Sequence, residues 1–517
     1  MMFALMLPAV LGAVGLAVDF ASMTKAQSKL QNAVDAAVLA ASRINDKATS
    51  REQVFQDFLA ANIAGEPTLA NVTANIEIDT GLNYISTEGL AVADVELQFG
   101  LLFGGARRIK VTASAYESRN DLEVVLALDN TGSMGAARMA ELRKAATSLV
   151  DILALAHSPD SNPKRVVKAA LVPFVTAVNV RGKGFKESWI DSRWDPAVRE
   201  FKSYGAQYSG ANFDKDSRNN KPWAHTELFR RLKGSGETLD TIGWKGCVEA
   251  RAAPYNLTDT APDVTVPDTL FVPYFAPDNP GKNEVSPNSS TAWNNSYLND
   301  SFGKNDQAKT KSIARYVPAT ASTIRENVSR SSGPNYACPT PIVPLTSDFA
   351  ELKTEIGKMI YWEGSGTNVS EGLMWSHRVL SPEEPYTDGA PFNSENNSKF
   401  VVVFTDGENT VFGASSQNYN KSDYGAYSFV DSGRVDIDRN KALTKVNTWT
   451  LDACTSLKAK QVEVFTVLLG ADTQANRNLY TKCATTPDHY YPTNDVSQLD
   501  GVFKKIAARI AKLYVTN

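Results

Sequence analysis

The sequence predicts an α/β fold with a doubly wound, mostly parallel sheet, preceded by an N-terminal helix and a small β-rich segment. Three observations lead to this class. Apolar runs of strand length, such as Leu122–Leu128 and Val462–Leu469, are typical of buried parallel strands. Segments with helical periodicity separate these runs, which is the alternation of a doubly wound sheet. An uncharged run, Met1–Val18, precedes both.

The composition fits a folded chain and excludes several classes of protein. The 517 residues include 53 Lys and Arg against 57 Asp and Glu, a formal net charge of −4. This length predicts roughly three domains. A hydrophobic share of 43% excludes wholesale disorder. The slightly negative charge offers no electrostatic footprint for nucleic acid, so no nucleic-acid partner is expected.

Met1–Val18 is predicted to be a transmembrane anchor. Its 18 residues span about 27 Å as a helix, close to the roughly 30 Å core of a bilayer. A cleaved signal peptide and a buried core helix are the alternatives. We favour a retained anchor because no basic residue precedes the run and Ala17-Val18-Asp19 is a poor cleavage site. The missing basic flank also leaves the orientation unreadable by the positive-inside rule.

The helix is expected to continue beyond the anchor, so that residues 1–44 form one segment. Leu30, Val34 and Val38 repeat at helical spacing in an Ala-rich stretch. Residues 45–118 are predicted to be a small β-rich segment, because apolar residues alternate along much of it. A long helix followed by a small sheet is a pilin-like α+β layout.

Residues 119–517 are predicted to form the α/β domain, interrupted by an insertion at 181–334. The insertion is rich in Asn, Ser, Asp, Gly, Pro and aromatic residues, and its tryptophans indicate local packing of its own. The other expected strands are Val166–Val175 and Phe400–Thr405, and the expected helices are Met139–His157, Phe349–Met359, Val369–Leu380, Leu443–Lys460 and Val496–Tyr514.

Oxygen-bearing side chains follow the ends of these predicted strands or precede helices. The first strand ends in Asp129, and Thr131 and Ser133 follow on the loop into a helix, where Gly132 permits a tight turn. Thr367 precedes another helix, and Asp406 follows another strand. Ligands of open α/β sheets bind at the carboxyl ends of strands, and hydroxyl and carboxylate oxygens suit Mg²⁺. The alternative is a set of metal-free turns with capping residues.

This pattern resembles the metal-ion-dependent adhesion site of the von Willebrand factor A family. That motif is Asp-x-Ser/Thr-x-Ser, then a Thr, then an Asp on separate loops. The resemblance implies the ligands Asp129, Thr131, Ser133, Thr367 and Asp406. It also implies a Rossmann-like doubly wound fold, partly water-mediated aspartates and an open position for a partner's carboxylate. Mg²⁺ is the expected ion, with Mn²⁺ and Ca²⁺ as alternatives.

A second resemblance covers nearly the whole chain. Six segments are similar to TadG-type proteins of the Flp/Tad pilus assembly system, which carry a TadE/G-like N-terminal segment and a von Willebrand A domain. The resemblance implies one span in the bacterial inner membrane, with the bulk of the chain periplasmic or extracellular. The segments are LQNAVDAAVLAASR, DNTGSM, GWKGCVEARAAPYNLTDTAP, NYACPTPIVPLT, GTNVSEGLMWSHRVLSP and FTDGEN.

The four cysteines allow three disulfide connectivities. Cys454 lies in a predicted helix before the Val462 strand, and Cys483 lies beyond that strand, so we expect neighbouring elements to bring them together. Cys247 and Cys338 would then join the insertion to the core. An exported chain would be oxidised in this way, whereas a cytosolic chain would keep four buried thiols.

The sequence predicts a protein that binds rather than catalyses. It contains no readable Ser-His-Asp or Cys-His arrangement and no P-loop, so no catalytic residue and no small-molecule substrate are expected. The favoured function is a membrane-tethered adhesion or assembly module that binds a pilus or pilus-assembly protein, with lipid around its anchor. The alternatives are a structural minor-pilin-like component and a metal-dependent hydrolase with Glu408 as its base.

Overall fold

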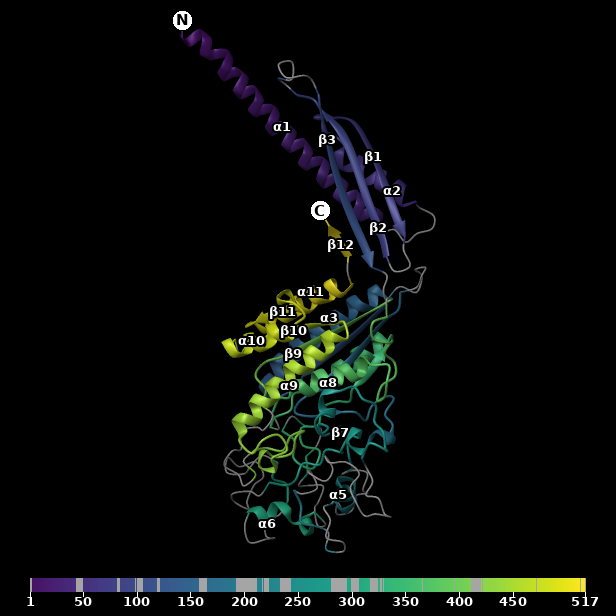
Figure 1. Cartoon of the computed structure of the whole chain (residues 1–517), viewed down its shortest axis with the longest axis vertical. Helices are drawn as coiled ribbons and strands as arrows, with labels where there is room; N and C mark the ends of the chain where they lie inside the picture. The colour runs from purple at the N-terminus through teal and green to yellow at the C-terminus, as the bar shows by residue number, and fades with distance from the viewer. Residues whose placement is uncertain are drawn as a thin grey trace. The chain divides into compact units, whose positions relative to one another are not determined.

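The computed structural model (Figure 1) shows a chain of two units, which are described here one at a time. The helix–sheet unit comprises residues 1–120, 158–165 and 508–517, and the α/β unit comprises 121–157 and 166–507. The structure describes residues 2–42, 50–80, 84–97, 99, 106–118, 121–157, 165–191, 212–215, 217, 223–232, 243–279, 295–298, 306–316, 324–325, 328, 330–364, 366–394, 396–410, 420, 422–470, 472–511 and 513–516.

The helix–sheet unit packs two helices against one face of an antiparallel sheet of order β1-β2-β3-β12. Apolar residues of α1 and α2, such as Leu30, Val38 and Phe55, meet alternate residues of the strands. The helices approach β2 so closely that a Cβ on Gly89 would clash with the Val38 side chain. The bounds are α1 Met2–Ser42, α2 Arg51–Ile63, β1 Leu69–Thr80, β2 Tyr84–Val95, β3 Arg107–Ser118 and β12 Leu513–Thr516.

The predicted N-terminal helix is present as α1. Among the described residues, no helix is both long and apolar enough for a membrane span. Met1 and residues 43–44 of the predicted segment lie outside the described residues. Pattern reading did not find α2, whose first turn is capped by the Ser50 hydroxyl accepting from the Gln53 N–H.

The α/β unit contains a sheet of order β11-β10-β9-β4-β5-β6-β7, in which the five strands from β11 to β5 run parallel. The chain moves outward from β4 to β5 and later continues on the other side of β4, as in a doubly wound fold. The main bounds are β4 Asp121–Asp129, α3 Gly135–Ala156, β5 Val167–Phe174, β6 Val178–Asn179, β7 Cys247–Val248, β8 Val343–Thr346, α7 Phe349–Lys358, α8 Val369–Leu380, β9 Asn397–Thr405, α9 Arg439–Ala459, β10 Val462–Leu469, α10 Gln474–Cys483, β11 Tyr490–Thr493 and α11 Leu499–Ala511.

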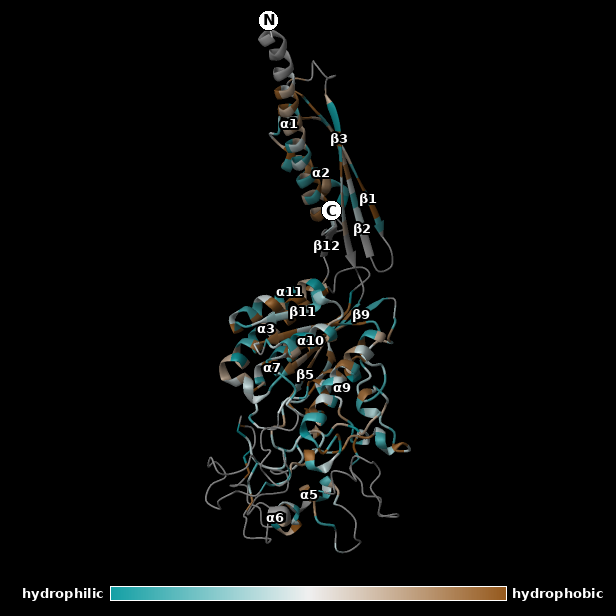
Figure 2. Ribbon diagram, turned by 60° about the vertical axis from the view of Figure 1, so that its left-hand side comes forward, coloured by the Kyte–Doolittle hydropathy of each residue, from teal (hydrophilic) through white to brown (hydrophobic). Residues whose placement is uncertain are grey.

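Helices cover both faces of this parallel sheet (Figure 2). On one face, α8, α9 and α10 share a buried apolar cluster with β4, β9 and β10. On the other face lie α3 and α11, where Phe503 of α11 meets Phe404 of β9. Because both faces are buried, the strands are continuous apolar runs, which is why their positions could be read from the sequence.

The C-terminal prediction needs one correction. The helix expected over Val496–Tyr514 ends at Ala511, and Leu513–Thr516 forms β12. Leu513 pairs with Glu117 of β3 in antiparallel register. Aromatic and β-branched residues suit a strand, and the free edge of β3 offers backbone hydrogen bonds that an isolated helix end lacks.

The predicted insertion at 181–334 lies only partly within the described residues. Its described part includes α5 His225–Arg231 and α6 Asp306–Lys311. Aromatic residues from separate stretches form a buried cluster there, as the composition predicted. The cluster includes Phe213, Trp223, Phe229, Phe275, Tyr297 and Tyr316.

Candidate oxygen-ligand site at the carboxyl end of the parallel sheet

Asp129 is the last residue of β4 and is fully buried. Its Oδ1 accepts a hydrogen bond of 2.8 Å from the Thr131 N–H. Its Oδ2 accepts one of 2.7 Å from the Thr405 hydroxyl, at the end of the neighbouring strand β9. Both carboxylate oxygens are therefore held in place by residues at the carboxyl ends of adjacent parallel strands.

The hydroxyls of Thr131 and Ser133, on the loop after β4, link this loop to Asp406. Oγ1 of Thr131 and Oγ of Ser133 are 3.0 Å apart. The Ser133 hydroxyl donates to Oδ1 of Asp406 at 2.6 Å. Asp406 follows β9 directly and is buried, whereas Ser133 is exposed. Four of the five predicted ligands thus form one connected group that reaches the surface at Ser133.

Thr367, the fifth predicted ligand, is fastened to the loop that carries Asp406. Its N–H donates to Oγ1 of Thr410 at 3.1 Å, and the Thr410 N–H donates to the Thr367 carbonyl at 3.0 Å. Nearby, the side-chain oxygen of Asn409 accepts from the Val369 N–H at 2.8 Å. No hydrogen bond joins the Thr367 hydroxyl to the other four predicted ligands, all of which are described. The structure therefore joins the loop of Thr367 to the loop that carries Asp406. The hydrogen-bonded group itself contains only Asp129, Thr131, Ser133 and Asp406.

Sequence reasoning missed two residues that touch this group. Thr405 orients Asp129, and its position just before Asp406 at a strand end was the available signal. Arg138, in α3, places Nη1 2.8 Å from Oδ2 of Asp406. No spacing rule pointed to Arg138, because its partner is far away in the sequence.

Glycine is required for different reasons at different positions of the loop after β4 and the loop before α8. Gly132 allows close approach, since a Cβ there would lie 3.0 Å from Cα of Glu363. The left-handed backbone is at Gly135, with φ of +55°, rather than at Gly132. Gly364 has φ of +102° and packs against the Tyr336 side chain. The tight turn predicted at Gly132 is present as a 3₁₀ turn over Gly132–Met134, and the positive φ follows it at Gly135.

Burial and charge make the ionisation of Asp129 unfavourable. Desolvation, and to a lesser extent repulsion from Asp406, raise the pKa of Asp129 from 3.8 to about 7. The hydrogen bonds from Thr131 and Thr405 act in the opposite direction. Two carboxylates so close together are a place where a cation is electrostatically favourable.

The donor set fits a hard cation such as Mg²⁺. Ligands at 2.0–2.1 Å in an octahedron have neighbouring oxygens about 2.9 Å apart, and the separations here are 3.0 Å for Thr131–Ser133 and 2.6 Å for Ser133–Asp406. Within the described part of the chain, no three His, Cys, Asp or Glu side chains gather as a metal site. The group relies instead on two carboxylates and on hydroxyls.

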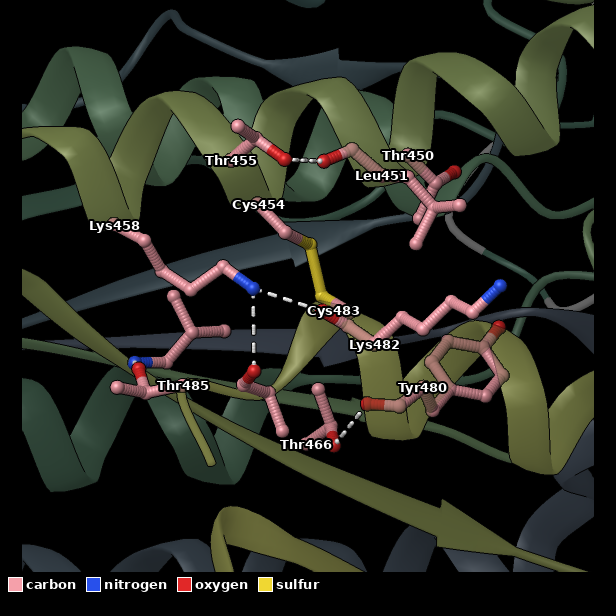
Figure 3. Close-up of a disulfide and its surroundings, with 12 residues drawn as sticks. Thr450, Leu451, Cys454, Thr455, Lys458, Thr466, Tyr480, Lys482, Cys483 and Thr485 are labelled. Atoms are coloured by element: carbon pink, nitrogen blue, oxygen red, sulfur yellow. Dashed lines mark hydrogen bonds between the residues drawn. A yellow bond between two sulfur atoms is a disulfide. The ribbon is translucent and has the colours of Figure 1, made fainter. Parts of the chain in front are cut away.

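Both predicted disulfides are confirmed. Cys454 of α9 bonds Cys483 of α10, with Cα atoms 5.1 Å apart (Figure 3). Cys247 bonds Cys338, with Cα atoms 5.8 Å apart. Close to the first disulfide, the Tyr480 hydroxyl of α10 donates to the Gly407 carbonyl at 2.9 Å. The disulfide thus braces the helix that supports the loop carrying Asp406.

Residues 1–46 match the family model for the Flp pilus-assembly TadE/G-like segment. This match covers the helix α1 and its immediate surroundings and does not extend into the α/β unit. No curated protein matches the chain in sequence.

Solved structures of pilus proteins share low similarity with the chain. The pilus adhesin SpaC from Lactobacillus rhamnosus GG has 10% identity and a TM-score of 0.31, over 87% of this chain and 35% of SpaC. This chain thus spans about a third of the SpaC chain. The vWF domain of the type V pili tip protein Mfa5 from Porphyromonas gingivalis has 10% identity and a TM-score of 0.32, over 76% and 95% of the two chains. The adhesive tip pilin GBS104 from Group B Streptococcus agalactiae has 12% identity and a TM-score of 0.31, over 75% and 100%.

Proposed function

We propose that this chain is a membrane-tethered, metal-dependent protein-binding module of a Flp/Tad-type pilus system. The observation that carries the proposal is the connected group of Asp129, Thr131, Ser133 and Asp406 at the carboxyl ends of β4 and β9. We assign the α/β unit to the von Willebrand factor A family on the residues of its adhesion motif. The function is binding to another protein, with no catalysis.

In this proposal, Asp129, Thr131, Ser133 and Thr367 hold Mg²⁺, and Asp406 contributes directly or through water. When bound, the ion supplies the positive charge that a partner's carboxylate needs. The chain's own residues set the geometry: Thr405 orients Asp129, and Ser133 lies at the exposed side, where a partner can approach. Mn²⁺ and Ca²⁺ use the same oxygen donors.

The tether is proposed from the N-terminal part of α1 and its family match. Val14, Leu16, Val18 and Phe20 are large apolar residues that stay exposed in this unit, and exposed apolar surface of this kind supports contact with lipid. Residues 1–46 match a pilus-assembly family model. We place the protein in the bacterial inner membrane with its bulk outside the cytoplasm, where the two disulfides are chemically stable.

The proposal is tested by Mg²⁺ titration calorimetry on the full chain and its Asp129→Ala variant. Loss of a direct ligand should weaken Mg²⁺ binding at least about 100-fold, because even supporting residues of metal sites cost about 10–100-fold. The matched control is Asp151→Ala, which removes an exposed aspartate of α3 paired with Lys353. Equal Mg²⁺ affinity in all three proteins would refute the metal site.

The partner is sought by pull-down with and without chelator. A partner released by chelator and lost in Asp129→Ala supports the adhesion role. If the protein is incorporated into purified filaments equally well with chelator and as Asp129→Ala, the structural, minor-pilin-like alternative is favoured. The hydrolase alternative gains little from the geometry, since its only candidate base, Glu408, is exposed to solvent.

A further inference from the structure

We propose that Arg138 is an internal counter-ion that competes with the metal for Asp406 and thereby lowers the metal affinity of the site. This inference rests on the proposed function, because it concerns the same oxygen group. The inference goes beyond the proposed function by assigning a role to Arg138, a residue outside the ligand motif.

The first observation is the geometry at Asp406. Its Oδ2 lies 2.8 Å from Nη1 of Arg138, and its Oδ1 accepts from the Ser133 hydroxyl at 2.6 Å. Both oxygens of this carboxylate are therefore engaged by the chain itself. The Arg138 side chain is 44% exposed and that of Asp406 only 1%, so the guanidinium reaches a buried carboxylate from the solvent side.

The second observation is the position of Arg138 in its helix. Arg138 lies in the first turns of α3, which begins at Gly135. A cation is unfavourable near a helix N-terminus, because the helix dipole is positive there. The helix itself gives no reason for a basic residue at this position. The carboxylate of Asp406 explains the basic residue, since it is the acidic group that Arg138 contacts.

The third step is electrostatic exclusion. The guanidinium of Arg138 places a positive charge 2.8 Å from Oδ2 of Asp406. A divalent cation that approaches Asp406 meets this fixed positive charge and must displace it into solvent. The exposure of Arg138 makes that displacement feasible without opening the core. The Asp406–Arg138 pair therefore subtracts from the free energy of metal binding.

The test is Mg²⁺ titration calorimetry on the full chain, comparing the wild type with Arg138→Gln. Hydrogen bonds between charged groups are stronger than those between neutral groups, so removing the Arg138 guanidinium from Asp406 should change the metal affinity measurably. Because the Arg138 side chain is 44% exposed and water screens its charge, we expect Arg138→Gln to bind Mg²⁺ about tenfold more tightly. Arg138→Lys, which keeps the charge on a shorter reach to Asp406, should fall between the two.

The matched control is Lys144→Gln, which removes one positive charge from the same helix. Lys144 is 62% exposed and lies 3.6 Å from Glu141 instead of at the site, so its loss should change the affinity less than about twofold at physiological salt. Thermal unfolding without metal checks that every variant folds.

The outcomes separate this inference from the proposed function. If the wild type binds Mg²⁺ and Arg138→Gln binds no more tightly, Arg138 does not compete, although the metal site stands. If Lys144→Gln tightens binding as much as Arg138→Gln, the effect is general electrostatics and the inference falls. If neither the wild type nor Arg138→Gln binds Mg²⁺, both the proposed function and the inference fall.

Discussion

The two sheets of this protein place their charged residues differently. The antiparallel sheet has helices on one face, so polar and charged side chains alternate along its other face. The parallel sheet is covered on both faces, and the charged residues of its central strands stand near the strand ends. Glu123 of β4 pairs with Lys399 of β9 near their amino ends, while Asp129 ends β4 at the carboxyl side. Burial on both faces thus confines the charged side chains of these strands to the strand ends.

Two aspartates show what this difference does to ionisation. Hydrogen bonds from Arg108 and Asn71 lower the pKa of Asp94 on the antiparallel sheet. Burial raises the pKa of Asp129 on the parallel sheet to about 7, with Asp406 adding to the effect. The charged form of an aspartate is thus stabilised on the open sheet face, at Asp94, and destabilised at the buried strand end, at Asp129.

The largest expected effect is the pH dependence that Asp129 gives to stability. The folded chain keeps this proton up to pH of about 7, whereas an unfolded aspartate loses it near 3.8. The folded state therefore binds more protons in that window, and stability without metal should fall as pH rises through it. A shift of this size amounts to several kcal/mol, since each pKa unit is worth about 1.4 kcal/mol.

Asp129→Asn, which mimics the neutral form, should remove this loss. The measurement is thermal unfolding in chelator at about pH 5 and about pH 8. The melting temperature of the wild type should drop between these values more than that of Asp129→Asn. Parallel behaviour of the two proteins would mean that Asp129 ionises normally, and the contrast with Asp94 would disappear.

The second effect in size is removal of the Cys454–Cys483 disulfide. Its cysteines are 29 residues apart, a loop whose closure corresponds to about 3–4 kcal/mol of stability. Replacing both by Ala should destabilise the α/β unit and raise amide hydrogen exchange in α9 and α10. Peptides of β1, β2 and β3 should keep their exchange rates.

The control for this variant is Thr455→Ala, which changes the adjacent exposed residue of α9 (Figure 3). It should leave exchange in α10 unaltered. A double cysteine variant as stable as Thr455→Ala would show that the disulfide is dispensable to the region that supports Gly407.

The smallest effect is expected from Arg108→Gln on the open sheet face. Arg108 lies 3.0 Å from Asp94, but its side chain is 73% exposed. Exposed ion pairs contribute little because water and salt screen them. We expect no resolvable change in the melting temperature at low or high salt, with Lys110→Gln on the same strand as the comparison. A clear loss of stability for Arg108→Gln alone would show that the open face is coupled to the core.

The sequence predicted the parallel strands well for a physical reason. A strand buried on both faces must be apolar throughout, and Val462–Leu469 matches β10 at both ends. The ligand motif could be read because three of its residues are close together and each segment stands at an element end. The expected Mg²⁺ itself stays a prediction, as do the residues proposed to bind it.

Contacts between distant segments that neither a motif nor a cysteine marks could not be read from the sequence. Arg138 and Asp406 are 268 residues apart in sequence, and they meet only because the fold brings the start of α3 to the residue that follows β9. The strand β12 depends on the free edge of β3, which a local pattern cannot reveal. The helix α2 was missed because its buried residues, Phe55 and Leu59, are too few for a clear stripe.

The pairing of β12 with β3 has a mechanical consequence. In the chain, β3 precedes the α/β unit and β12 follows it, and a further connection runs through residues 158–165. The strands β3 and β12 are hydrogen-bonded neighbours in one sheet. The part of a pulling force that reaches this sheet through its two adjacent strands would therefore be divided between β3 and β12. The shorter one, Leu513–Thr516, has four residues of pairing to lose before the load passes wholly to β3.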